Sequence, residues 1–354
     1  MRLKDLRGKL KVKTEIIVCD PEGFDADDLK LAADSIKNGG IVAFPTETVY
    51  GLGGSGLSDT AVAKIYEAKG RPSNNPLILH FASVDDIETY AECSEAFYRL
   101  ASAFMPGPLT VVLPSKNKCA AAVTAGLDTV AVRVPIHPVA RELIKLSGVP
   151  IAAPSANISG RPSPTDFSHV YYDLNGRVDA IIDGDECTFG LESTIVKLDG
   201  DGAVLLRPGA ITLEMLEEVL GDVKVAPEVL AAPKDDAVVL SPGMLFKHYA
   251  PNAPLFLIRS NDPAHLAHYM GELAENPDNA VICYNGDVKN KDNVFYIGSR
   301  EDMLTQAKNL FSLLRTADSI HPKRIYAPMP DSHGIGLALV NRMLRAAAFK
   351  IKDI

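Results

Sequence analysis

Two cations lie two residues apart in the segment Lys69-Gly70-Arg71-Pro72, and Pro76 follows shortly after it. Helix-favouring residues precede the segment and strand-favouring residues follow it, so both cations are expected at a turn between a helix and a strand. Arginine offers a planar fork of donors and lysine a compact charge, a combination that suits a polyphosphate. Taken alone, the segment is equally compatible with a solvated, proline-rich surface turn.

Two further polar residues stand inside apolar segments. Arg133 lies within residues 130–134, which are expected to form a strand that could be buried on both faces. A buried guanidinium requires an anion, which would be either a structural Asp or Glu or the carboxylate of a ligand. His80 lies in the similar segment 77–81. It could be a core histidine that is hydrogen-bonded within the protein, or it could bind a ligand.

Small polar residues and glycines follow several of the expected strands. Residues 45–54 combine hydroxyls, Glu47 and closely spaced glycines, which favours close approach of the backbone to a ligand. Ser155 and Asn157 follow another strand, at the edge where open α/β sheets bind ligands. Ser193 and Arg207 stand at two further strand ends. Neither the GxGxxG motif nor a Walker A loop, the two common nucleotide-binding motifs, is present. The pattern indicates a cavity that binds an anion and does not use a protein nucleophile.

The elements that would position these residues alternate between helix and strand, which predicts an α/β fold with at least one mixed sheet. The expected helices are 25–37, 59–68, 84–91, 95–104 and 138–146, and the expected strands are 41–44, 77–81, 110–113, 130–134, 150–153, 180–182, 193–198 and 203–206. Turn formers then accumulate, so the catalytic unit is expected at 1–221 and a linker at 222–252. A smaller α/β unit is expected at 253–354, with strands 255–258, 280–284 and 294–297 and helices 262–275, 300–316 and 336–350.

Composition narrows the class of protein. The chain has 354 residues, of which 47% are hydrophobic and 23% charged, and a formal net charge of −9. These values are typical of a globular protein of two domains, and the acidic balance argues against a broad nucleic-acid surface. Five cysteines are scattered without metal-ligand spacing. With no apolar run of membrane-spanning length and no signal-peptide pattern, a cytoplasmic location is expected.

Taken in order, the motifs resemble those of YrdC-like threonylcarbamoyl-AMP synthases in their two-domain form. The resemblance rests on residues 45–53, Lys69-Gly70-Arg71-Pro72, Met105-Pro106-Gly107-Pro108, Val132-Arg133-Val134-Pro135, Ser155-Ala156-Asn157, Glu192-Ser193-Thr194 and Arg207-Pro208-Gly209. Ser241-Pro242-Gly243-Met244 and His248-Tyr249-Ala250-Pro251 are similar to the family's linker, and Asn341-Arg342 to a motif of its C-terminal domain. The resemblance implies a twisted open mixed sheet with a central cavity, followed by a smaller Rossmann-like domain.

The resemblance also implies a reaction: L-threonine, bicarbonate or CO2, and ATP give L-threonylcarbamoyl-AMP and pyrophosphate, with Mg²⁺ expected to accompany the nucleotide. This would be a nucleotidyltransferase activity, and separate proteins would transfer the threonylcarbamoyl group to tRNA, so tight tRNA binding is not expected. By matching positions, the resemblance implies that threonine is bound by Thr48, His80, Arg133, Ala153 and Ser193. It implies that ATP is bound by Lys69, Arg71, Asn75, Thr129, Ser155, Ser163, Arg207 and Tyr249. Lys69 and Arg71 would be the catalytic cations, and no protein-bound metal is expected.

Two other functions compete with this one. A carbamoyl transferase that contains the same domain would carry acylphosphatase and zinc-finger segments, and this chain has no paired cysteines. An RNA-binding regulatory module of the same fold would be expected to show basic runs or aromatic platforms, which the sequence lacks. In the synthase interpretation, His248-Tyr249 is the candidate lid that excludes water from the reaction.

Overall fold

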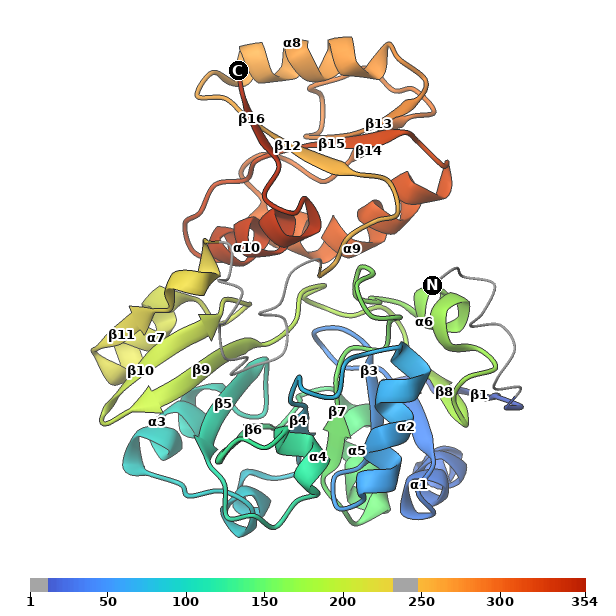
Figure 1. Ribbon diagram of the computed structural model, residues 1–354, viewed down its shortest axis with the longest axis vertical. Coiled ribbons are helices and arrows are strands. Elements are labelled where there is room, and N and C mark those ends of the chain that lie inside the picture. The colour runs from blue at the N-terminus through green and yellow to red at the C-terminus, as the bar shows by residue number, and fades with distance from the viewer. Residues whose placement is uncertain (1–11, 232–247) are drawn as a thin grey trace.

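The computed structural model describes residues 12–231 and 248–354, which form two sheets with helices around them (Figure 1). The larger sheet has eleven strands and the smaller sheet five. Within the described residues no helix is both long and apolar enough to cross a membrane.

The larger sheet is mixed, because parallel and antiparallel pairs alternate irregularly across it. Its strands, in order across the sheet, are β1 (Glu15–Val18), β8 (Ala180–Asp183), β2 (Ile41–Phe44), β3 (Gly51–Ser55), β7 (Ile151–Ala153), β4 (Ile78–His80), β6 (Thr129–Arg133), β5 (Leu109–Pro114), β9 (Thr194–Asp199), β10 (Gly202–Arg207) and β11 (Val223–Val225). The accompanying α-helices are α1 (Lys30–Lys37), α2 (Asp59–Lys69), α3 (Glu95–Phe104), α4 (Ala121–Thr124), α5 (Pro138–Ser147), α6 (Phe167–Leu174) and α7 (Leu213–Leu220). The central strands are buried on both faces, which confirms the mixed α/β fold expected from the sequence.

The smaller sheet is parallel throughout. Its order is β14 (Val294–Tyr296), β13 (Asn279–Cys283), β15 (Arg324–Pro328), β12 (Leu255–Arg259) and β16 (Ile351–Asp353). Helix α8 (Pro263–Ala274) covers its outer face, and α9 (Met303–Ser319) and α10 (Gly336–Ala346) lie between the two sheets (Figure 1). A parallel sheet with helices on both faces is the Rossmann-like arrangement expected for this part of the chain.

Three sequence expectations differ from the structure. Residues 51–54, expected in a ligand-binding turn, form most of strand β3. A Cβ on Gly53 would lie 2.4 Å from a side-chain atom of Ile151 and 2.7 Å from one of Phe44, so packing rather than a turn requires this glycine. Residues 84–91, expected as an α-helix, form the shorter 3-10 helix η3 (Val84–Thr89).

The third difference concerns the expected linker at 222–252. Its first residues form β11, which pairs in parallel with β10 and completes the larger sheet, and the 3-10 helix η4 (Pro227–Val229) follows. The Ser241-Pro242-Gly243-Met244 motif lies outside the described residues. The larger unit therefore extends beyond residue 221.

The turn that carries Lys69 and Arg71 is formed as the sequence predicts. Ser58 caps the start of α2 by accepting a hydrogen bond from the backbone N–H of Ala61. Gly70 ends the helix with φ +60°, the left-handed conformation that glycine adopts without steric cost. The helix therefore ends at Lys69, and Arg71 begins the passage to β4.

Candidate active site

A single cavity joins most of the residues singled out in the sequence. It lies against the larger sheet, and His248 and Tyr249 also line it. The predicted residues in its wall are Thr48, Arg71, His80, Arg133, Ala153, Ser155, Ser193, Arg207 and Tyr249. The other predicted residues, Lys69, Asn75, Thr129 and Ser163, are not part of the wall, and their positions are described below.

Arg133 has a structural anion. Its Nη2 lies 2.7 Å from Oε1 of Glu47 and 2.9 Å from Oγ1 of Thr48, and the ion pair is almost completely buried. Of the two alternatives left open by the sequence, the structure thus supplies a carboxylate from the protein itself. The second carboxylate oxygen of Glu47 is buried without a partner among the described residues. Glu47 therefore fixes the guanidinium of Arg133 at the cavity wall and is a positioning residue that sequence matching missed.

His80 is a neutral, buried imidazole. Its Nδ1 donates to the carbonyl of Ile78 at 3.1 Å, and its ring meets Phe44 edge to face with centroids 6.2 Å apart. Burial, reinforced by the charge of Arg133, lowers the pKa of His80 to about 3. His80 thus has a hydrogen-bond partner inside the protein and also lines the cavity. At neutral pH its uncharged ring can form a hydrogen bond with a ligand but cannot bind it as a cation.

The lowered pKa of His80 predicts a pH dependence of stability. In the unfolded chain His80 binds a proton below about pH 6.5, whereas in the folded chain it stays neutral down to about pH 3. The unfolded state therefore binds more protons between these values, and the free energy of unfolding falls as the pH falls below about 6.5. At pH 5 we expect a loss on the order of 1–2 kcal/mol from this residue. Urea denaturation of the chain and of His80→Gln at pH 7.5 and 5 measures it, and an equal pH slope in both proteins would contradict the prediction.

Lys69 is buried, and its ammonium group points to the segment after β7. It donates to the carbonyl oxygens of Ser155 and of Asn157. Burial, and next the nearby charge of Arg71, lowers the pKa of Lys69 well below the usual value for lysine. In this structure Lys69 holds the Ser155–Asn157 backbone in place, and Arg71 is the cation of the pair that faces the cavity.

Arg71 is held by backbone carbonyls and keeps unused donor capacity. Its Nη2 lies 3.3 Å from the carbonyl oxygen of Pro76 and 3.5 Å from that of Asn75. Its buried Nε has no partner within the described part of the chain. Burial lowers the pKa of Arg71 to about 10, so the group remains charged at neutral pH. A buried cation with a free donor is prepared to accept an anion.

Asn75 and Thr129 are not among the residues that line the cavity. In the parallel pair of β4 and β6, Ile78 stands opposite Ala131. Thr129 begins β6 and lies four residues before Arg133, about 13 Å along the strand from it. Asn75 lies beside Arg71, whose Nη2 is 3.5 Å from the carbonyl oxygen of Asn75.

Ser163 reaches the site through Glu192, a carboxylate in the wall that sequence matching did not select. Ser163 Oγ donates to Oε1 of Glu192 at 2.5 Å, and Arg342 Nε donates to Oε2 at 2.7 Å. Burial alone would raise the pKa of Glu192, but Arg342, Arg207 and Ser163 outweigh it and lower the pKa. Glu192 is therefore a charged carboxylate with both oxygens engaged.

Arg207 is fixed by its neighbour in the sheet. Its Nε donates to the carbonyl of Ser193 and its Nη2 to Oγ of Ser193, each at 3.0 Å. The Ser193 hydroxyl also lies 2.8 Å from the hydroxyl of Thr110. Burial lowers the pKa of Arg207 to about 10, which leaves a third permanent cation at the wall.

The C-terminal unit contributes directly to this network. Arg342, on α10, is fully buried and also donates to the carbonyl of Pro208 at 2.9 Å. Its guanidinium lies 5.6 Å from the ring centroid of Tyr249, and the rings of Phe311 of α9 and of His248 lie 5.1 Å and 5.2 Å from that ring. A polar Asn341-Arg342 pair inside the apolar face of a helix was the available sequence signal, but it did not reveal the partner 150 residues away.

Tyr249 covers the cavity in a constrained conformation. Its φ is +67°, a value that bulky residues rarely adopt, and it is held beside the site because the N–H of Ala250 donates to the carbonyl of Gly160 at 2.8 Å. With His248 and Tyr249 in the wall, the cavity has a volume of about 50 Å³, far below the roughly 300–1,000 Å³ of pockets that hold drug-sized ligands.

The fold and site together define a mixed α/β protein in which three arginines, Arg71, Arg133 and Arg207, line one cavity. A family model described as "Telomere recombination" matches residues 34–209, and one described as "Threonylcarbamoyl-AMP synthase, C-terminal domain" matches residues 211–348.

Curated relatives and solved structures give a consistent result. The threonylcarbamoyl-AMP synthase of Pyrococcus abyssi is 42% identical over 95% of this chain and 98% of its own length, and that of Bacillus subtilis is 40% identical over 99% of each. The crystal structure of P. abyssi Sua5 complexed with L-threonine superposes with a TM-score of 0.90 at 42% identity, covering 96% of this chain and all of that one. Escherichia coli YciO, at 23% identity and a TM-score of 0.51 over 55% of this chain, shares the fold. The chain belongs to the threonylcarbamoyl-AMP synthase family.

Proposed function

We propose that this chain synthesises L-threonylcarbamoyl-AMP from L-threonine, bicarbonate or CO2, and ATP, with release of pyrophosphate, for the threonylcarbamoyladenosine modification of tRNA. The observation that carries the proposal is the convergence of both predicted ligand sets on one cavity. Thr48, His80 and Arg133 of the threonine set line the same cavity as Arg71 and Arg207 of the nucleotide set. The product would then pass to separate proteins that act on tRNA.

The chemistry requires positioning and charge stabilisation rather than a protein nucleophile. The amine of threonine adds to CO2 and gives a carbamate, and a carbamate oxygen then attacks the α-phosphorus of ATP while pyrophosphate leaves. Arg133, oriented by Glu47, would bind the threonine carboxylate, and neutral His80 would act as a hydrogen-bonding partner. Arg71 and Arg207 would stabilise the charge that develops on the phosphates. In enzyme classification this is a nucleotidyltransferase.

Magnesium would enter with the nucleotide rather than reside on the protein. Among the described residues, no three His, Cys, Asp or Glu side chains gather to hold a metal ion. The carboxylates nearest the cavity, Glu47 and Glu192, are committed to Arg133 and Arg342. Phosphate oxygens would therefore supply the ligands of Mg²⁺, and the roles of the side chains do not depend on it.

The decisive experiment is release of pyrophosphate from ATP by the purified chain without RNA. The proposal expects release that requires both L-threonine and bicarbonate, and a product with the mass of threonylcarbamoyl-AMP. The RNA-binding module considered for the same fold would show no such release. Pyrophosphate production that ignores threonine would overturn the assignment.

Tyr249 is proposed to act as a lid whose loss uncouples the reaction. A cavity of about 50 Å³ is too small for ATP, so part of its wall must move for ATP to enter. The segment of Tyr249 is the part that would open and then close again over the intermediate. A carbamate loses CO2 and an adenylate hydrolyses, so an open site exposes both to water. We expect Tyr249→Ala to consume ATP while yielding AMP and free threonine in place of most of the product.

Chromatography of the nucleotides after a fixed ATP turnover measures this leak. Tyr249→Phe is the matched control, because it retains the ring that packs on Phe311 at 5.1 Å and lies 5.6 Å from the guanidinium of Arg342. An unchanged ratio of threonylcarbamoyl-AMP to AMP in Tyr249→Ala would refute the lid.

A further inference from the structure

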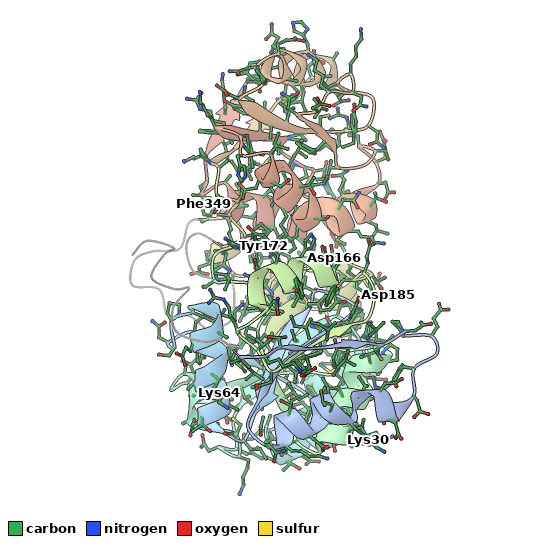
Figure 2. The ribbon with its side chains drawn as sticks, turned by 90° about the vertical axis from the view of Figure 1, so that its right-hand side faces the viewer. Lys30, Lys64, Asp166, Tyr172, Asp185 and Phe349 are labelled. Carbon is green, nitrogen blue, oxygen red and sulfur yellow. The ribbon has the colours of Figure 1, made fainter. Side chains whose placement is uncertain are left out.

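A second hollow lies at the junction of the two units, which we call the interdomain cleft. It is bounded by α6 with residues 161–162, by segment 250–252, and by the end of α9 through residue 321. Its volume is about 570 Å³, within the range of small-ligand sites, which occur preferentially at domain interfaces. Figure 2 shows Tyr172 of α6, and Asp166 just before that helix, at the level where the C-terminal helices meet the larger unit. The reaction chemistry proposed above does not use this cleft.

Two arginines that line the cleft share one buried carboxylate. Asp173 is fully buried and accepts from Arg161 Nη1 at 2.9 Å and from Arg315 Nη2 at 2.8 Å. Two guanidinium groups thus share one carboxylate, which leaves one positive charge uncompensated within the triad. Arg315 comes from α9 and also donates to the carbonyl of Pro162 at 2.6 Å, while its buried Nε has no partner among the described residues.

Other carboxylates at the cleft are already engaged. Asp318 accepts from the side chain of Asn252 at 2.5 Å and from the backbone N–H of Ala253 at 2.9 Å. Asp166, at the start of α6, accepts from Ser168 and lies 3.0 Å from the ring of His169. Both carboxylates keep their negative charge, and the arginine pair is the part of the cleft that offers donors to a ligand.

An exposed aromatic ring stands beside the cations. Tyr172 is 76% exposed, an unusual state for a large aromatic residue, and the guanidinium of Arg161 lies 5.6 Å from its ring centroid. The imidazoles of His169 and His321 line the same cleft. Planar groups beside an arginine provide stacking surfaces for a nucleobase, since every base presents a π-face.

We propose that the interdomain cleft binds a purine nucleoside monophosphate. The base stacks at Tyr172, and the phosphate meets the donors of Arg161 and Arg315 that Asp173 leaves available. The hydroxyl groups of Thr316 and Ser319, in the last turn of α9, donate to backbone carbonyls of the same helix and can accept hydrogen bonds from the ribose. A single mononucleotide matches the volume of the cleft, its paired guanidinium groups and the exposed ring of Tyr172.

A ligand in the cleft should affect the reaction cavity, because neighbouring residues of the same two segments contact the cleft and the cavity wall. Pro162, which accepts from Arg315, directly precedes Ser163, which donates to Glu192 in the cavity wall. Ala250, at the cleft, directly follows Tyr249, which covers the cavity. A ligand that joins α6 to α9 therefore restrains the segment that must move for ATP to enter, and bound mononucleotide slows turnover.

Calorimetric titration of the full chain with AMP tests the site. The reaction cavity is first saturated with L-threonine and a non-hydrolysable ATP analogue, so that any remaining binding reports the cleft. We expect one AMP per chain under these conditions, and a loss of affinity of about 10-fold in Tyr172→Ala, in line with one stacking contact. Arg161→Gln should weaken AMP and inorganic phosphate while leaving the weaker binding of adenosine unchanged.

Tyr171→Ala is the matched control, because Tyr171 is on the same helix but does not line the cleft. It should bind AMP as the unsubstituted chain does. No AMP binding once the reaction cavity is filled, or equal affinity in Tyr172→Ala, would overturn the inference. Threonine-dependent pyrophosphate release measured on the same preparations separates this failure from a failure of the proposed function.

Discussion

Arg71→Ala is expected to slow threonine-dependent pyrophosphate release by at least about 100-fold. Arg71 is the buried cation that faces the cavity from the helix-to-strand turn, and its Nε has no partner among the described residues. A preorganised donor of this kind, aimed at charge that develops during the reaction, contributes about 10²–10³ in rate. A continuous pyrophosphate assay at saturating ATP measures the change in kcat.

The control is Lys64→Ala, which removes a cation from the same helix on an exposed face. Lys64 contacts only the backbone carbonyl of Gly39 among the hydrogen bonds described, at 2.6 Å, and should leave turnover within about twofold (Figure 2). Arg71→Lys separates charge from geometry, because lysine retains the charge but not the planar fork. Turnover of Arg71→Ala within threefold of the unsubstituted chain would remove Arg71 from the phosphate site.

Lys69 should behave differently from Arg71, although the two are separated only by Gly70. Its ammonium group supports the carbonyls of Ser155 and Asn157 rather than facing the cavity. Lys69→Ala is therefore expected to abolish pyrophosphate release and also to lower the melting temperature. Thermal unfolding followed by circular dichroism distinguishes the two variants, and an unchanged melting temperature in Lys69→Ala would show that its role is not to hold this backbone.

The sequence predicted local features of the site well because they depend on local signals. The turn at Gly70 follows from a helix end, a glycine and two prolines, and the burial of Arg133 follows from the apolar strand around it. Strand β3 was missed because glycine is unfavourable in strands, and only the close approach of Phe44 and Ile151 explains its use here.

The partners of the buried charges could not be predicted, because they depend on contacts between distant segments. Glu47 and Arg133 are 86 residues apart, and their pairing requires the order of strands across the sheet. Neither residue type nor spacing specifies that order. Similarly, β11 was hidden in the expected linker, because a three-residue strand among turn formers is defined by its pairing with β10 rather than by its own pattern.

Arg342→Ala is expected to destabilise the chain by about 3–5 kcal/mol and to abolish product formation. Arg342 is fully buried and compensates Glu192, so its removal leaves a carboxylate buried without its counter-ion. The substitution also removes the guanidinium group beside the ring of Tyr249 and the hydrogen-bond donor to the carbonyl of Pro208. Urea denaturation measures the free energy of unfolding. The pyrophosphate assay, run without urea and at a temperature where the variant remains folded, measures activity.

A double-mutant cycle with Glu192→Gln decides whether the pair acts as a unit. If the cost of Arg342→Ala comes from the uncompensated charge, Arg342→Ala combined with Glu192→Gln should be more stable than Arg342→Ala alone, while activity stays lost. Lys323→Ala is the control, because its pairing with Asp278 at 2.6 Å is exposed and should contribute less than about 1 kcal/mol. A cost of Arg342→Ala below 1 kcal/mol would mean that the two units fold around the active site independently. A large cost that Glu192→Gln relieves would mean that the C-terminal unit supplies the charge on which the shape of the nucleotide end of the cavity depends.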